Sequence, residues 1–234
     1  MPNDDKFCIM SSDEDNLGPK VVIDDMNLII CTKQLSDAAE LAHQTNVGNI
    51  NMRLYYIHVL MKHVAIHANS STMCLDNILT GVLPDLVVMG FVTETAFAGS
   101  YTENSYNFKN FKIKQMDLFR NGTRVPQFGY LPNFTNKIYN QAYFTFQEQL
   151  GFDQGDRCVN IRPKEWADGF NLYSFKITDG PIGSGTVGQN ASETGSARLE
   201  FDFETAPQGN LKLIIMYQML GSFEIDRLKE IVVS

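Results

Sequence analysis

The stretch Arg198-Leu199-Glu200-Phe201-Asp202-Phe203-Glu204 alternates charged and apolar side chains without a break. Successive side chains of a β-strand point to opposite faces, so this pattern predicts a strand with Leu199, Phe201 and Phe203 toward a core and the charged residues toward solvent. A strand that is apolar on one face only is typical of an antiparallel sheet with one covered face. The stretch therefore favours a sheet that packs against a second layer.

Similar patterns on both sides of this stretch predict further strands. The segment 52–68 is apolar on both faces at its start, which is typical of a strand covered on both sides. In the segment 111–120 the apolar residues change parity midway, as a β-bulge would require. Asn121-Gly122 follows directly and favours a type I′ hairpin turn, because both residues tolerate positive φ. The other predicted strands are 21–32, 85–93, 172–178 and 211–218.

One segment has a clear helical pattern. Tyr139, Tyr143, Phe146 and Leu150 recur at spacings of four, three and four residues within 136–150. Thr135 is a suitable N-cap and Gly151 a suitable left-handed C′ residue. A short helical turn is also expected over 36–43. With about eight strands, one amphipathic helix and many turns, the fold class predicted is all-β, a single jelly-roll β-sandwich.

The length and charge of the chain limit which domains and which binding partners can be expected. The chain has 234 residues and a formal net charge of −8, and its basic residues are scattered. Scattered basic residues argue against direct nucleic-acid binding, which needs clustered Lys and Arg. The longest apolar runs fall short of a membrane span, so no membrane partner is expected. We expect a flexible acidic arm over 1–19, which has no periodic apolar face, and one jelly-roll domain over 20–234.

The cysteines and the N-terminal residues indicate in which cellular compartment the protein is expected. Cys8, Cys31, Cys74 and Cys158 are far apart and form no C-x-x-C pair, so we interpret them as reduced thiols. The N-terminus is polar and acidic, unlike a secretory signal. The protein is therefore expected in the cytoplasm or nucleus and not as a secreted protein. On that view, the four glycosylation sequons at Asn69, Asn121, Asn133 and Asn190 are chance matches.

Three features were weighed as sites of chemistry. Residues 183–188 match G-x-G-x-x-G, but loop composition and a strand follow where a dinucleotide site needs a helix. His63 and His67 have the i, i+4 spacing of metal ligands on a helix, yet on a strand they lie about 13 Å apart. Trp166 is interpreted as a core or loop anchor rather than a sugar-stacking platform. No catalytic residue, metal ligand or cofactor is predicted, and the protein is not expected to be an enzyme.

Several stretches, taken in order, resemble the C-terminal jelly roll of the major capsid proteins of Polinton (Maverick) elements and their adintovirus relatives. The resemblance covers about residues 76–227, with a weaker match back to Val21. Its motifs are DNILTGVLP at 76–84, VVMGFV at 87–92, AFAGSY at 96–101, NFKNF at 107–111, FRNGTRVP at 119–126, GFNLYSF at 169–175 with Thr178, RLEF at 198–201 and FEIDR at 223–227.

The resemblance implies a structural role in a protein shell. Members of that family are double jelly rolls that trimerise into capsomers, whereas this chain has room for one roll only. We therefore expect a capsid-type protein that self-associates as a homotrimer or larger assembly, in a single-roll form that is a truncated, split or domesticated copy. Other capsid proteins are further expected partners, and the protein is expected in a virion if it is viral. The alternative is a non-catalytic jelly-roll module that binds a glycan or a protein.

Overall fold

The structure is a computed structural model, and it describes residues 6, 9–10, 22–49, 51–152, 159–177, 193–226 and 230–233. The chain divides into two compact units. The larger unit holds Val59–Met219 together with Met1–Pro19, and the smaller unit holds Lys20–His58 and Leu220–Ser234. Strands β1 and β8 each pass from one unit into the other, and the units are described separately below.

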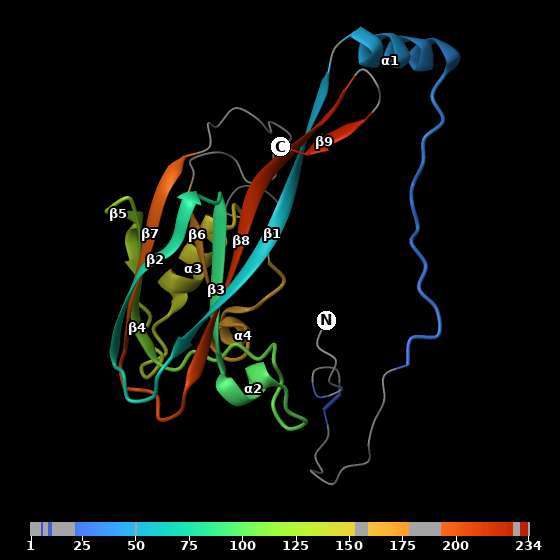
Figure 1. Cartoon of the computed structure of the whole chain (residues 1–234). Coiled ribbons are helices and arrows are strands. Elements are labelled where there is room, and N and C mark those ends of the chain that lie inside the picture. The colour runs from blue at the N-terminus through green and yellow to red at the C-terminus, as the bar shows by residue number, and fades with distance from the viewer. Residues whose placement is uncertain are drawn as a thin grey trace. The chain divides into compact units, whose positions relative to one another are not determined.

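The strands form two antiparallel sheets (Figure 1). The first has the order β1-β8-β3-β6, with β1 at Met52–Ile66, β8 at Leu211–Ile225, β3 at Leu86–Thr93 and β6 at Leu172–Lys176, and the short β9 at Ile231–Val233 also pairs with β8. The second has the order β2-β7-β4-β5, with β2 at Thr72–Val82, β7 at Thr194–Phe203, β4 at Ile113–Arg120 and β5 at Thr123–Tyr130. Eight strands in these two orders are a jelly roll, in which consecutive strands lie in different sheets except for the β4–β5 hairpin.

The core of the larger unit lies between the two sheets. The prediction for β7 is confirmed, because Leu199, Phe201 and Phe203 are all at most 4% exposed. The Phe201 ring packs edge-on against Phe91 of β3 with 5.2 Å between ring centroids. Edge-to-face contacts of this kind stabilise an aromatic core beyond simple burial. The sandwich is therefore closed by aromatic side chains from both sheets.

The described part of the chain also contains four helices: α1 at Asp37–Asn49, α2 at Glu94–Ala98, α3 at Asn140–Gln149 and α4 at Pro163–Ala167. Helix α3 is the predicted amphipathic helix and buries Ala142, Tyr143 and Phe146. Gly151 has φ +75, as expected of a left-handed residue after a helix. Among the described residues, no helix combines the length and the apolar character needed to cross a bilayer.

The start of α3 was predicted four residues too early. Residues Asn133 and Ile138 exchange two backbone hydrogen bonds of 2.8 Å, which hold the chain between them in a turn. The helix begins only after this turn. The Thr135 hydroxyl, predicted to cap the helix, instead donates to Glu204 at 2.6 Å.

Two turn and bulge predictions are confirmed. Asn121 and Gly122 connect β4 to β5 with φ values of +47 and +83, the positive values that a type I′ turn needs. Register shifts interrupt β4 between Ile113 and Gln115 in its pairing with β7. They account for the parity change of its apolar residues, because each irregularity moves the following side chains to the other face.

Two predictions of local structure are wrong, one predicted helical turn is longer than expected, and one strand was not predicted. Residues 22–32 are not a strand, because the structure gives them no paired neighbour. The helical turn expected over 36–43 is the longer helix α1. Strand β1 is not covered on both sides: most of its side chains are exposed. Strand β2 was not predicted as a strand, since its alternation is interrupted by a register break between Leu75 and Leu79.

Other expectations fall on residues outside the described part of the chain. Apart from Lys6, Ile9 and Met10, the acidic arm over 1–19 is outside it, and so are the residues 183–188 that match G-x-G-x-x-G. The proposal that 20–234 forms one jelly-roll domain stays a prediction.

Candidate assembly surface

Strand β1 presents apolar side chains to solvent within the smaller unit. Leu54, Tyr55, Tyr56 and Ile57 are 37–46% exposed. Because successive residues of a strand point to opposite faces, both faces of β1 are open here. The strand also stands at the end of the sheet order, so one of its edges has no paired strand in the described structure. A long apolar edge strand is a template for pairing with another chain.

Contacts with the end of β8 hold this part of β1 in place. The guanidinium of Arg53 donates from Nε to Glu224 Oε1 at 2.8 Å, and this carboxylate raises the pKa of Arg53. The Tyr56 ring lies so close to Gly221 that a Cβ there would be 2.6 Å from Tyr56 Cζ. Tyr56 also contacts the Phe223 ring at 6.1 Å. The absence of a side chain at Gly221 therefore makes room for an aromatic residue of the edge strand.

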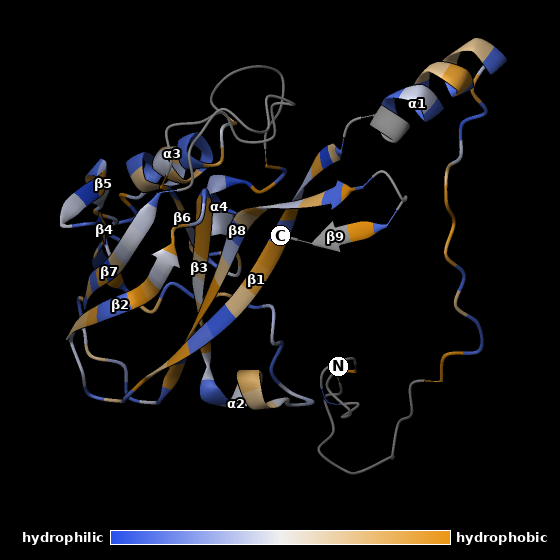
Figure 2. Cartoon of the chain, turned by 45° about the horizontal axis from the view of Figure 1, so that its top comes forward, coloured by the Kyte–Doolittle hydropathy of each residue, from blue (hydrophilic) through white to orange (hydrophobic). Residues whose placement is uncertain are grey.

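The exposure of β1 continues in the larger unit. Val59, Leu60 and Met61 are 53%, 42% and 70% exposed. Lys62 Nζ donates to the carbonyl of Ile78 at 2.8 Å, which joins β1 to β2 of the opposite sheet. Figure 2 shows hydrophobic colouring along much of β1. This run of exposed apolar residues on neighbouring positions is larger than the scattered apolar residues of an ordinary surface.

The other sheet edges carry features that discourage pairing. At β6, the amide of Lys176 donates to the side chain of Gln149 in α3 at 3.0 Å, and Ser174 Oγ donates to the carbonyl of Phe146 at 2.7 Å. At β5, Pro126 offers no backbone donor. At β2, Asn77 has positive φ beside the register break. Covering helices, prolines and bulges are the usual protections of an edge, and they leave β1 as the candidate surface.

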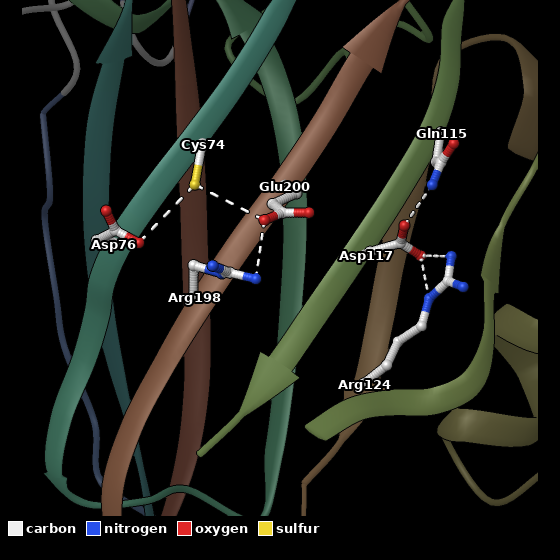
Figure 3. Close-up of polar contacts among 7 residues, drawn as sticks. All are labelled: Cys74, Asp76, Gln115, Asp117, Arg124, Arg198 and Glu200. Carbon is white, nitrogen blue, oxygen red and sulfur yellow. Dashed lines mark hydrogen bonds and ion pairs between the residues drawn. The ribbon is translucent and has the colours of Figure 1, made fainter. Parts of the chain in front are cut away.

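A buried ion pair joins β4 to β5 in the second sheet (Figure 3). The Asp117 side chain is 5% exposed, and its carboxylate accepts from Arg124 Nε at 2.7 Å, from the Arg124 Nη2 group, and from Gln115 Nε2 at 2.5 Å. Gly129 makes this possible, because a Cβ there would overlap the carboxylate. Each partner of Asp117 is a side chain of the same sheet, so the cluster supports the fold rather than a reaction.

A second polar group surrounds Cys74, whose thiol is free (Figure 3). Its Sγ lies 3.8 Å from Asp76 Oδ1 and 3.9 Å from Glu200 Oε1. Glu200 also pairs with Arg198 at 2.9 Å. Desolvation and the two carboxylates raise the pKa of Cys74. Because the thiolate is the nucleophilic form of cysteine, this environment makes Cys74 a poor nucleophile.

Carboxylates gather at one end of the larger unit. Glu94 and Asn210 line a cavity of about 360 Å³, and Asn210 Nδ2 donates to Glu94 at 2.9 Å while Lys212 Nζ lies 3.1 Å from it. These contacts lower the pKa of Glu94. Glu103 accepts from the hydroxyls of Thr93, at 2.6 Å, and Thr95, which lowers its pKa. Across the described ranges, no group of three His, Cys, Asp or Glu side chains could hold a metal ion.

The residues that were weighed as sites lie apart. His63 packs against the Phe97 ring at 4.8 Å and belongs to β1, whereas His67 follows the end of that strand. Trp166 is 0% exposed, and its Nε1 donates to the carbonyl of Leu172 at 2.8 Å. The interpretation of Trp166 as a core anchor is confirmed. The open surface of β1 was missed, because its apolar pattern is the same as that of a strand buried inside a sheet.

Comparison with known proteins places the chain among distant relatives. No protein-family model matches it. An uncharacterized protein of Caenorhabditis elegans is 22% identical over 165 residues, which cover 68% of this chain and 38% of that protein. The chain therefore spans well under half the length of this relative.

Solved structures of viral capsid chains align with most of this chain. PBCV-1 VP54, in a crystal structure fitted into a reconstruction of the virophage Sputnik, aligns with a TM-score of 0.47 and 11% identity, covering 82% of this chain and 54% of that one. The mavirus major capsid protein aligns with a TM-score of 0.43 and 10% identity, covering 81% and 42%. Because these TM-scores lie below 0.5, the assignment of a jelly-roll sandwich rests on the strand orders of the chain itself.

Proposed function

We propose that this chain is a capsid-type structural protein that associates with copies of itself in a protein shell. The observation that carries the proposal is strand β1, a 15-residue edge strand with exposed apolar side chains on both faces. Leaving such a surface in water is unfavourable, since apolar area gains about 25 cal/mol per Å² when it is buried. Association of identical copies is a common way to bury a surface that recurs on every chain.

The resemblance to Polinton and adintovirus major capsid proteins supports a shell of the capsid type. The motifs shared with Polinton and adintovirus major capsid proteins include residues of β3, of the β4–β5 hairpin and of β6. The eight-stranded jelly roll is compatible with that family's role. On this basis we propose a homotrimer or larger assembly, located in a virion if the protein is viral, with no catalytic turnover.

The burial of Trp166 argues against the alternative of a glycan-binding module. That module would use Trp166 as an exposed stacking platform, but Trp166 lies in the core. Tyr143, Phe146 and Tyr173 surround its ring at centroid distances of 5.9–6.3 Å. We therefore propose no second function.

The proposal is tested by the solution mass of the full chain. Size-exclusion chromatography with light scattering over a wide concentration range should give trimers or larger species, and negative-stain images should show closed or regular assemblies. The variant Ile57→Lys places a charge on the exposed face of β1 and should shift the mass toward the monomer. The matched variant Phe128→Lys, at a 74% exposed residue of β5, should keep the parent mass. A monomer at every concentration would refute the proposed function.

A further inference from the structure

In the described structure, the segment 22–30 is an apolar stretch with exposed side chains. Val22, Ile23, Met26, Leu28, Ile29 and Ile30 are 65–88% exposed. No backbone hydrogen bond joins residues 22–35 to another described part of the backbone. Six large apolar side chains in nine residues is a composition found in buried strands, not in solvated linkers. Something outside the described structure of this chain must therefore cover it.

The same segment has the pattern of a strand. Val22, Met26, Leu28 and Ile30 share one parity and form an apolar face when the backbone is extended, interrupted only by Asp24. The structure gives these residues neither a helix nor a paired strand. A lone strand is not stable in water and needs a partner edge that accepts its hydrogen bonds. To form a strand, the segment therefore needs the open edge of a sheet as its partner.

Strand β1 supplies an edge of suitable length and charge. Nine extended residues span about 30 Å, which fits along the 15 residues of β1. Between Met52 and Ile66, β1 carries Arg53 and Lys62 and no carboxylate, whereas the segment 22–30 carries Asp24 and Asp25 and no base. Arg53 already pairs with Glu224, so Lys62 is the β1 cation that would face these carboxylates, and both surfaces are apolar. Within the smaller unit, the apolar side chains of residues 22–30 and of Leu54–Ile57 in β1 are all exposed.

We propose that residues 22–30 of one copy pair as an added strand along β1 of a second copy. This inference rests on the proposed self-association and names the contact through which it occurs. Every chain carries both the donor segment and the acceptor edge, so exchange between copies covers both surfaces at once. Addition of a strand to an open sheet edge is a general mode of recognition, in which the backbone gives affinity and alternate side chains give specificity. If each copy donates its segment to the next copy around a ring, the contact is heterologous. If two copies donate their segments to each other, it is isologous.

The first test compares charged substitutions on the two faces of the segment. Leu28→Asp with Ile30→Asp places two carboxylates on the apolar face and should weaken association by at least about tenfold, as loss of central interface residues does. The matched variant Asn27→Asp with Cys31→Asp places two carboxylates on the other face and should retain the parent mass in light scattering. All four positions are exposed in the single chain, so neither variant should change its thermal unfolding.

The second test asks whether the contact joins different copies. Equal amounts of unlabelled and heavy-nitrogen-labelled protein are mixed and treated with a carbodiimide, which joins carboxylates to amines without a spacer. Peptides that contain Asp24 or Asp25 joined to a β1 peptide with Lys62 should include mixed-isotope pairs. Such pairs with only one isotope would show a segment that folds back on its own β1 and would overturn the inference.

The two tests separate this inference from the proposed function. If the parent assembles and Leu28→Asp with Ile30→Asp assembles equally well, the strand exchange is wrong while the shell role stands. If the parent is a monomer at every concentration, both are wrong.

Discussion

Replacing Phe201 by alanine should be among the most destabilising single changes in the larger unit. The side chain is 1% exposed and contacts the Phe91 and Phe203 rings at 5.2 and 5.5 Å. Burial of a phenylalanine side chain contributes about 1.5–3 kcal/mol. Each edge-to-face ring contact adds about 0.5–1.5 kcal/mol. The expected loss of unfolding free energy is therefore about 4 kcal/mol, within the range of about 3–5 kcal/mol known for such truncations.

Urea unfolding followed by tryptophan fluorescence measures this loss. Trp166 is the one tryptophan of the chain and is buried, so its emission reports on the core. The urea concentration at the unfolding midpoint should fall. The dependence of the unfolding free energy on urea concentration should stay unchanged, since Phe201→Ala and the parent expose a similar surface on unfolding. At about 2–4 °C per kcal/mol for a domain of this size, the melting temperature should fall by about 8–16 °C.

The neighbouring residue provides the control. Asp202 is the next residue of β7 and points to the opposite face of the sheet, so Asp202→Ala should change the unfolding free energy by less than about 0.5 kcal/mol. If Phe201→Ala unfolded at the same urea concentration as Asp202→Ala, the assignment of the inner and outer faces of β7 would be wrong, and with it the sandwich core.

Two further predictions concern charged groups. Arg124→Met leaves the buried Asp117 carboxylate without its cation and should lower the unfolding free energy, measured in urea, by about 3 kcal/mol. The double variant Asp117→Leu with Arg124→Met should recover most of that loss. Equal stability of the single and the double variant would contradict this prediction. Because Thr93 and Thr95 lower the pKa of Glu103 below its usual 4.5, its contribution to stability is complete above pH 4.5 and is lost as the pH falls through the lower, folded-state pKa. Thermal unfolding from pH 7 to pH 2 should show a shallower acid decline for Glu103→Gln than for the parent, and parallel curves would count against the role of this carboxylate.

The sequence predicts best where one local pattern has one structural solution. The alternation of residues 198–204 can bury Leu199, Phe201 and Phe203 only by facing them all to one side, and β7 does so. The pair Asn121-Gly122 was predicted as a turn because of a backbone preference that no distant contact needs to supply. Predictions that need knowledge of a distant partner fared worse. The start of α3 was missed because the turn between Asn133 and Ile138 is closed by backbone hydrogen bonds that side-chain periodicity does not report.

The two largest errors have a common physical cause, and it bears on function. Residues 21–32 were predicted as a strand and 52–68 as a strand covered on both sides. In the single chain the large apolar side chains of residues 22–30 and most side chains of β1 are exposed. An apolar pattern reports that a segment must be buried, but it does not report which chain buries it. A linker exposed to solvent gains nothing from Val22, Leu28, Ile29 and Ile30, and an edge strand exposed to solvent gains nothing from Ile57 and Met61. Both patterns are accounted for if the covering surface belongs to another copy, so the same residues that mislead a single-chain prediction are the ones that favour assembly.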